Sequence, residues 1–175
     1  EILLDAVEHT DTDLAAALGH LTSACAAVDI ELAAARQAFD LGPWGRSTPA
    51  ERIEVMNRFT AALAARPTAH VMLAMDGDEP AGLVITFEGF STFQCRPLLN
   101  IHDVVVAEKY RGLGLSKRLL AAVEEMAVRL GCCKLTLEVL EGNTIAQAAY
   151  RSVGFDGYQL DPSLGKALFW EKKLA

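Results

Sequence analysis

Hydrophobic and polar residues change their spacing about a third of the way along this chain. A short apolar run over residues 2–7 predicts an edge strand. Alanine and leucine, both strong helix formers, dominate residues 13–39 and predict one long helix or two shorter ones. A further helix is expected to begin at Thr48 and to stop before Pro67, because Thr48 and Glu51 have the spacing of a capping box.

The remaining two thirds of the chain predict three strands, then a helix, a strand, a second helix and two final strands. An aromatic loop is expected over residues 90–97. The expected helices are residues 114–130 and 143–153, where apolar positions recur at helical spacing. The expected strands are residues 69–75, 82–88, 98–106, 134–140, 155–160 and 167–174. This order predicts a single α/β domain over residues 1–175, with a mixed sheet covered by helices on both faces.

Composition and charge narrow the class of protein. The chain is 51% hydrophobic and 22% charged, with a formal net charge of -7, which argues against a nucleic-acid binder. No apolar run approaches the roughly 18 residues that a membrane helix needs, so no membrane partner is expected. The first residues show no basic segment followed by an apolar one, so we expect a cytoplasmic protein without a secretory signal.

The cysteines predict neither a metal site nor a redox pair. Cys132 and Cys133 are adjacent, and no second pair stands at metal-ligand spacing from them. We expect Cys25, Cys95 and this pair to be small, buried hydrophobic residues of a protein in a reducing compartment, with no zinc.

The sharpest chemical signal is a glycine-rich turn between a strand and an amphipathic helix. The strand ends at Val106, and the turn runs from Arg111 through Gly112 and Gly114 to Lys117. The first amides of a helix have no partner within it, and the helix dipole is positive there. Glycines let a ligand approach the main chain. This turn therefore suits a diphosphate, with Arg111 and Lys117 adding positive charge.

Three kinds of phosphate site compete for this turn. A P-loop needs Gly, four residues and then Gly-Lys-Ser or Gly-Lys-Thr, and the chain has no such string. A dinucleotide fingerprint needs a small residue where Lys117 stands. The third pattern, Arg-x-x-Gly-x-Gly or Ala, runs from Arg111 to Ser116, where serine takes the last small position. It resembles the acetyl-CoA loop of the GNAT acetyltransferase superfamily. Taken by itself, this motif is also explained by a plain strand–turn–helix whose glycines serve only packing.

A second string strengthens the resemblance, which covers residues 67–174. The superfamily carries Asn, Ala, Tyr and Gly-Phe after the strand that follows its long helix, and the same residues occur here in order and spacing. They are Asn143, Ala146, Tyr150, Gly154 and Phe155. The resemblance implies a GNAT-like central mixed sheet of about six to seven strands with helices on both faces. It also implies a splay between the fourth and fifth strands, and a cofactor-binding core over residues 98–155.

The resemblance further implies acetyl-CoA as co-substrate and a set of contacts to it. The three valines at the strand end would offer main-chain groups to the pantetheine arm, the turn would hold the pyrophosphate, and Asn143 would contact the arm. The residues expected at the cofactor are Val104, Val105, Val106, Arg111, Gly112, Leu113, Gly114, Leu115, Ser116, Lys117, Asn143 and Ala146.

Tyr150 is the expected catalytic acid. Attack of an amine on a thioester forms an oxyanion and then expels a thiolate. A phenol near the sulfur can protonate that thiolate, because tyrosine is neutral and can donate at pH 7. The plain alternative for Tyr150 is a core tyrosine with its hydroxyl on a carbonyl.

The general base is less decided by the sequence. His102 lies on the strand that leads to the turn, and its ordinary pKa suits proton transfer near neutrality. Asp103 follows it and is expected on the opposite face of the strand. Glu88 and Glu138 are further candidates, as is a water chain, and His102 is alternatively a structural residue.

The acceptor is expected to be a small-molecule amine, a peptide N-terminus or a lysine. The aromatic residues expected to line its site, or to serve only in packing, are Phe90, Phe93, Tyr158 and Trp170. An acetyl-CoA sensor or scaffold without fast turnover is the alternative function, and a protein-interaction domain is a third. A homodimer through the terminal strands is a further expectation from the resemblance.

Overall fold

The computed structural model describes residues 3–5, 42, 46–158, 161, 163, 170 and 172. The helices expected over residues 13–39 lie outside this part of the chain. Within it the elements, in order, are β1 (Leu3–Asp5), α4 (Pro49–Ala64), β2 (Ala69–Asp76), β3 (Glu79–Ser91), β4 (Arg96–Val106), η1 (Glu108–Tyr110), α5 (Leu115–Arg129), β5 (Leu135–Leu137) and α6 (Thr144–Ser152).

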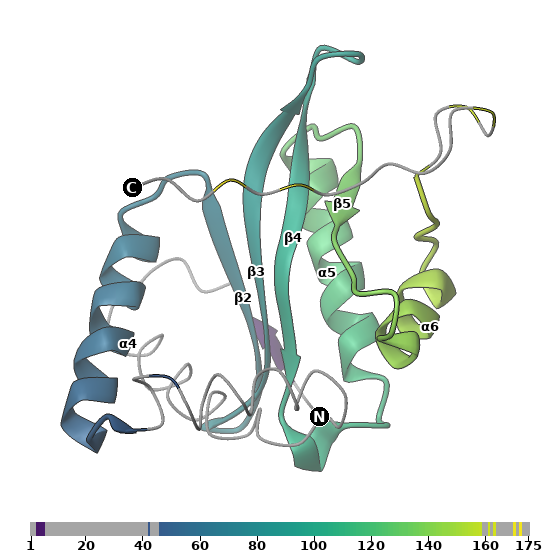
Figure 1. Cartoon of the computed structure of the whole chain (residues 1–175). Coiled ribbons are helices and arrows are strands. Elements are labelled where there is room, and N and C mark those ends of the chain that lie inside the picture. Colours follow the sequence, from purple (N-terminus) through teal and green to yellow (C-terminus); the bar gives the residue numbers. More distant parts are fainter. Residues whose placement is uncertain are drawn as a thin grey trace.

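The strands form one mixed sheet in the order β1-β2-β3-β4-β5 (Figure 1). β1 to β4 are antiparallel neighbours, and β5 runs parallel to β4. This confirms the mixed sheet and the edge strand near the N-terminus. The strand expected over residues 155–160 is absent from 155–158, and Trp170 and Lys172 carry no strand. The rest of the expected final hairpin lies outside the described residues.

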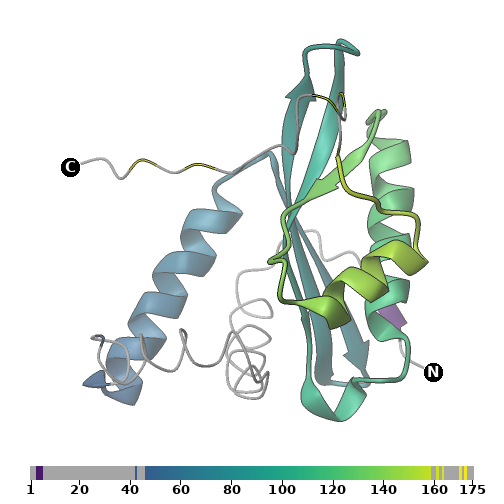
Figure 2. The ribbon, with the colours of Figure 1, turned by 45° about the vertical axis from the view of Figure 1, so that its right-hand side comes forward.

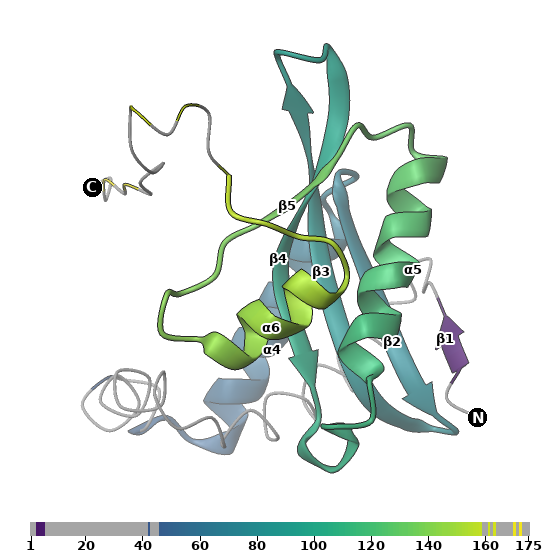
Figure 3. The same cartoon turned by 90° about the vertical axis from the view of Figure 1, so that its right-hand side faces the viewer.

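α5 covers one face of the sheet, and α4 lies on the other side of the sheet (Figure 2). α6 lies on the β5 side of the sheet and contacts α5 (Figures 1 and 3). Helices therefore flank both faces, as expected. No helix in the described ranges is both long and apolar enough to span a bilayer.

The beginning of α4 confirms the capping box. The Thr48 N–H donates to Glu51 Oε2 at 2.7 Å, and the Glu51 N–H donates to Thr48 Oγ1 at 3.3 Å. Pro49 occupies the first helical position, where its missing N–H has no cost. The hydrogen bonds from the Thr48 main chain and hydroxyl hold the pKa of the Glu51 carboxyl below its ordinary value.

The loop expected over residues 90–97 is wrong, because β3 and β4 pair almost to their tips. Phe90 is opposite Pro97, Ser91 is opposite Arg96, and only residues 92–95 form the turn. Proline usually signals a loop because it lacks an N–H. Here the Pro97 carbonyl accepts from the Cys133 N–H at 2.8 Å, so the strand uses only the group that proline retains.

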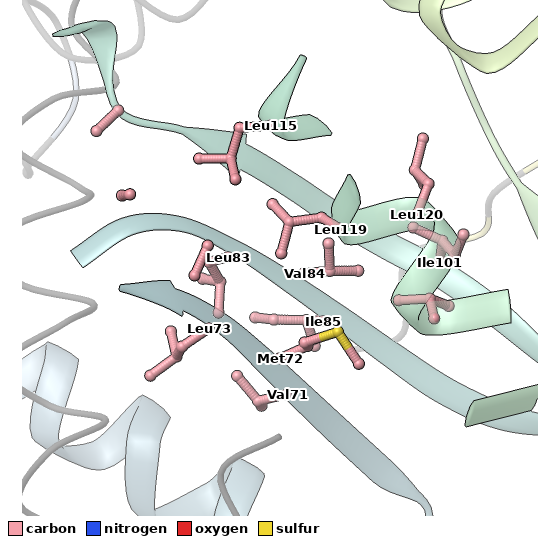
Figure 4. Packing of buried hydrophobic residues seen from close by; sticks show 14 of the residues in the cluster. Val71, Met72, Leu73, Leu83, Val84, Ile85, Ile101, Leu115, Leu119 and Leu120 are labelled. Atoms are coloured by element: carbon pink, nitrogen blue, oxygen red, sulfur yellow. The ribbon is translucent and has the colours of Figure 1, made fainter. Parts of the chain in front are cut away.

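Leucines of α5 pack on β3 and β4 to form the core on this face of the sheet (Figure 4). Leu119 is fully buried and lies beside Val84. A Cβ at Gly82 would lie only 3.0 Å from Leu119 Cδ1 and 3.0 Å from the Val105 carbonyl oxygen. Glycine at this position therefore lets α5 approach the sheet closely. The buried side chains of α5 are Leu115, Leu119, Leu120, Val123 and Ala127.

Candidate functional site

β4 and β5 pair over only three positions and then separate. The pairs run from Leu99 opposite Leu135 to Ile101 opposite Leu137. β4 continues to Val106, whereas the chain after Leu137 turns away from it (Figure 3). The strand expected over residues 134–140 is thus shorter than predicted, and the sheet is splayed as expected.

The last residues of β4 are consequently less covered than the sequence suggested. A run of three valines predicts burial on both faces, yet Val104, Val105 and Val106 are all half-buried. β3 pairs with this segment on one side and β5 no longer pairs with it on the other, so alternate main-chain groups of the segment face the gap between β4 and β5. The gap can accept an extended ligand that pairs like a strand.

The glycine turn has the backbone that an anion site requires. Gly112 has a φ of +74° and Gly114 a φ of +77°, both in the left-handed region that favours glycine. A Cβ added at either position would meet no atom within 4 Å, so the space in front of the turn is open. Gly114 is also the N-cap of α5, no side chain caps this helix, and its first turn holds no acidic residue. The amides at this end are therefore available to an anion.

The side chains in and beside the glycine turn differ in how far they are exposed to a ligand. The half-buried Arg111 donates from Nε to the Val106 carbonyl oxygen at 3.2 Å, which ties its guanidinium to the end of β4. Lys117 is exposed and Ser116 is half-buried, one turn into the helix. Leu115 is buried in the core, so only its main chain can reach a ligand.

The beginning of α6 brings the second predicted string close to the end of β5. Asn143 is the N-cap, and its Oδ1 accepts from the Ala146 N–H at 3.1 Å. The Asn143 side chain is thus held at the helix start, and its Nδ2 is a further hydrogen-bond donor. Tyr150 is half-buried on the same helix, with its ring edge against Phe155 at 6.0 Å between centroids. Gly154 ends the helix with a φ of +94°.

A β-bulge in β4 corrects the expected placement of His102 and Asp103. Asp103 is opposite Ile85 and Ile101 is opposite Thr86, so His102 is an extra residue between two pairs. This register puts His102 and Asp103 on one face of the sheet, not on opposite faces, because an inserted residue breaks the alternation. Both side chains are exposed on the face opposite α5. The His102 ring packs edge-on against Phe87, 5.5 Å between centroids.

The other two candidate bases separate between the two faces. Glu88 lies on the α5 face and bonds His70 Nε2 at 2.7 Å, so it does not join His102. Glu138 follows the end of β5, and its carboxylate accepts from Asn100 Nδ2 at 3.3 and 3.4 Å. Asn100 shares the face of His102 by register. The structure thus groups His102, Asp103 and Glu138 near the splay.

The aromatic residues expected at the acceptor site do not come together. Phe90 and Phe93 are 62% and 91% exposed, at the end of the β3–β4 hairpin that points away from the glycine turn (Figure 1). Tyr158 and Trp170 are also exposed. A cavity of about 280 Å³ lies elsewhere, lined by the second half of α5 together with residues 132–135 and 153–155, and it includes none of the predicted site residues.

Two contacts near the turn were not predicted from the sequence. The buried Tyr110 donates from its hydroxyl to Asp76 Oδ2 at 2.9 Å. Asn100 also donates to Thr136 Oγ1 at 3.2 Å across β4 and β5. Tyr110 directly precedes Arg111, the first residue of the glycine-rich motif, and this position could have marked Tyr110 as part of the site. No local sequence pattern indicated that Asp76 is its partner.

Comparison with known proteins decides the family. The model of the acetyltransferase (GNAT) family matches residues 31–155, which include the splayed strands, the glycine turn and α6. The chain belongs to the GNAT family. The family inferred from the two sequence strings is therefore confirmed.

Curated relatives of this GNAT chain are named as N-acetyltransferases. It is 30% identical over 86 residues to a thialysine N-epsilon-acetyltransferase of Caenorhabditis elegans, covering 49% of this chain and 53% of the relative. It is 33% identical over 91 residues to an L-ornithine N5-acetyltransferase of Arabidopsis thaliana, covering 50% and 40%. The chain thus spans about half the length of these relatives, or less.

Solved structures share the fold of this chain. An aminoglycoside acetyltransferase from an uncultured soil metagenomic sample, in complex with sisomicin, has a TM-score of 0.68 at 14% identity and covers 99% of this chain and 97% of its own. The acetyltransferase AAC(6')-Iy, in complex with a CoA-containing bisubstrate analogue, has a TM-score of 0.66 at 14% identity and covers 99% of both chains. At these identities the likeness establishes the fold.

Proposed function

We propose that this chain transfers an acetyl group from acetyl-CoA to a primary amine, with both substrates bound at once. The observation that carries the proposal is the start of α5, where two left-handed glycines and an uncapped helix end face open space. Such an end binds a diphosphate through main-chain amides. The GNAT family match and the acetyltransferase relatives support the same activity.

The residues of the site suit acetyl-CoA, which supplies an acetyl thioester when bound. The amides from Gly112 to Ser116 would hold the pyrophosphate, with the side chains of Arg111 and Lys117 adding charge. The Lys117 N–H donates instead to the Gly114 carbonyl at 3.1 Å. Val104 to Val106 would pair with the pantetheine arm in the gap beside β4, and the Asn143 amide would contact the arm. Leu113, Leu115 and Ser116 take part through the main chain of the turn, and Ala146 lies on the first turn of α6.

We propose a small cationic amine as the acceptor, reached from the face that carries His102. The curated relatives named for thialysine and for L-ornithine support this class, as does the aminoglycoside complex among the similar folds. The carboxylates of Asp103 and Glu138 lie on that side of the splay and would attract a cation. They would also favour a small charged acceptor over a neutral one.

Tyr150 acts in this proposal as the acid, and the base comes from the group beside the splay. The phenol of Tyr150 gives its proton to the departing thiolate, which makes the thiol a better leaving group. His102, or Asp103 beside it, accepts the proton of the attacking ammonium directly or through water. Glu138, held by Asn100, is the remaining acceptor of that proton.

Calorimetric titration with acetyl-CoA is the first test, followed by a screen of diamines for thiol release. Binding and turnover with a diamine support the transferase. Binding without turnover across the screen indicates an acetyl-CoA sensor or scaffold instead, and absence of binding contradicts the proposal.

The role of Tyr150 has its own matched pair of variants. Tyr150→Phe should lower kcat at least about 100-fold with little change in the Kd of acetyl-CoA, because only the proton donor is lost. Tyr158→Phe, at an exposed tyrosine outside α6, should leave both unchanged. Unchanged turnover in Tyr150→Phe would show that another group protonates the thiolate.

We also propose that the protein works in the cytoplasm and forms a homodimer. Cys95, Cys132 and Cys133 carry free thiols, which suits a reducing compartment. They are not buried as expected, because Cys95 is exposed and the other two are half-buried. Light scattering after size-exclusion chromatography measures the oligomeric state, and a mass of one chain would exclude the dimer.

A further inference from the structure

The segment between β4 and the glycine turn is tied to the turn that joins β2 and β3. The Tyr110 hydroxyl donates to Asp76 Oδ2 at 2.9 Å, and Tyr110 is only 6% exposed. Next to it, the Lys109 ammonium pairs with the Glu79 carboxylate and lies 4.7 Å from the centre of the Tyr110 ring. These four residues form what we call the β2–β3 anchor. It joins two parts of the chain that meet at one end of the sheet (Figure 1).

The main chain makes the anchor rigid up to the first glycine. The Ala107 N–H donates to the Ala81 carbonyl at 2.9 Å, which continues the pairing of β3 and β4 past the last residue of the strand. Within η1 the Tyr110 N–H donates to the Ala107 carbonyl at 2.9 Å, and the Arg111 N–H to the Glu108 carbonyl at 3.1 Å. A shift of the Tyr110 ring would therefore move Arg111 and the glycines that follow.

The glycine turn itself cannot supply this rigidity. Gly112 and Gly114 have no side chains to pack, and nothing lies within 4 Å of where a Cβ would be. Glycine also has the largest backbone freedom of any residue. The positions of the amides must therefore be set from the two ends of the turn. Leu115 fixes one end in the core, and Tyr110 is buried at the other.

We propose that Tyr110 and Asp76 are positioning residues for acetyl-CoA: their hydrogen bond fixes the glycine turn against the β2–β3 hairpin so that its amides converge on the pyrophosphate. This inference rests on the proposed binding of acetyl-CoA at that turn. Neither residue contacts the reacting atoms. Asp76 is exposed, so water can replace its carboxylate and the fold survives without it. Loss of the bond should therefore change ligand affinity more than stability.

The test compares two ligands in three single variants. Tyr110→Phe and Asp76→Asn each weaken the anchor bond, and Asp78→Asn makes the same charge change at an exposed residue of the same turn. Acetyl-CoA carries the diphosphate, whereas S-acetylpantetheine carries the acetyl thioester and the arm without it. Calorimetry measures the Kd of the first ligand, and NMR titration reaches the weaker Kd of the second.

We expect Tyr110→Phe and Asp76→Asn to raise the Kd of acetyl-CoA about 5- to 10-fold, the effect of losing one charge-assisted hydrogen bond. The Kd of S-acetylpantetheine should stay the same, because that ligand does not reach the turn. Asp78→Asn should change neither. The double variant should resemble Tyr110→Phe, since both substitutions act on the same bond.

Two results would overturn the inference. An unchanged Kd of acetyl-CoA in both anchor variants would show that the bond does not position the turn. Equal weakening of both ligands would show a general structural role. If Tyr110→Phe does not fold, Asp76→Asn decides the question alone, because Asp76 is an exposed residue and the substitution keeps the size of its side chain. Failure of the wild-type protein to bind acetyl-CoA would instead contradict the proposed function.

Discussion

The helices α4 and α5 begin in opposite ways. At α4 the side chains of Thr48 and Glu51 satisfy two of the amides at the helix start. At α5 the N-cap is Gly114, without a side chain, and the first turn has no acidic residue. The first arrangement closes a helix end with its own atoms and favours stability. The second leaves the amides for an outside anion, and the core leucines must hold the helix in place.

The largest effect on ligand binding should come from blocking the uncapped start of α5. The double variant Gly112→Asp, Gly114→Asp places two carboxylates where the pyrophosphate is expected, so acetyl-CoA should bind at least about 1,000-fold more weakly, about 4 kcal/mol. Calorimetry measures this. Gly131→Asp is the matched control, because Gly131 also has a positive φ and open space but lies past the other end of α5. Equal binding by the double variant would place the anion site elsewhere.

The next largest effect is a loss of stability that tests whether core packing holds α5 in place without a cap. Leu119→Ala leaves a cavity under the helix and should lower the free energy of unfolding by about 3 kcal/mol. Urea unfolding measures this loss. Val128→Ala, on the same helix but 72% exposed, should change the free energy by less than about 0.5 kcal/mol. No loss in Leu119→Ala would mean that helix propensity, which alanine favours, and not packing stabilises α5.

A smaller effect is expected at the closed end. Thr48→Ala removes the cap of α4 and should cost about 1 kcal/mol of stability. The Kd of acetyl-CoA should not change, because α4 lies on the other side of the sheet from α5 (Figure 2). Unfolding in urea and calorimetry on the same sample separate the two quantities. A change in the Kd of acetyl-CoA would show that the start of α4 affects binding at the start of α5.

The smallest effect is the pH dependence of the same cap. The pKa of Glu51 is lowered in the folded protein by its bonds to Thr48, so its charge stabilises the fold above the unfolded pKa. This stabilisation is lost as the pH falls through the folded pKa. The stability difference between the wild type and Glu51→Gln should thus be constant above about pH 4.5 and vanish in stronger acid. A difference that persists at low pH would exclude the carboxylate as its source.

The sequence predicted best what depends on neighbours three or four residues apart. The cap at Thr48, the beginning of α5 at Gly114 and the beginning of α6 at Asn143 all depend on such short spacings. The two strings that identified the family lie at these helix starts. Local chemistry therefore located the glycine turn.

Contacts between distant residues were not predicted. Tyr110 and Asp76 are 34 residues apart, and no pattern along the chain pairs a tyrosine with one of many aspartates. The extension of β3 and β4 to Ser91 and Arg96 depends on cross-strand pairing. Gly89 and Pro97 indicate a loop here when the sequence is read without that pairing. β5 is short because the chain after Leu137 departs from β4, although Val139 continues the apolar alternation.

The bulge at His102 makes β4 tolerant of a length change at one point. Deleting an ordinary strand residue would turn every side chain beyond it to the opposite face. Ile101 and Val104 lie on the α5 face on either side of the bulge, with two residues between them. Removing His102 would restore plain alternation and keep both on that face. The strand could therefore have gained this histidine by a single insertion without disturbing the core.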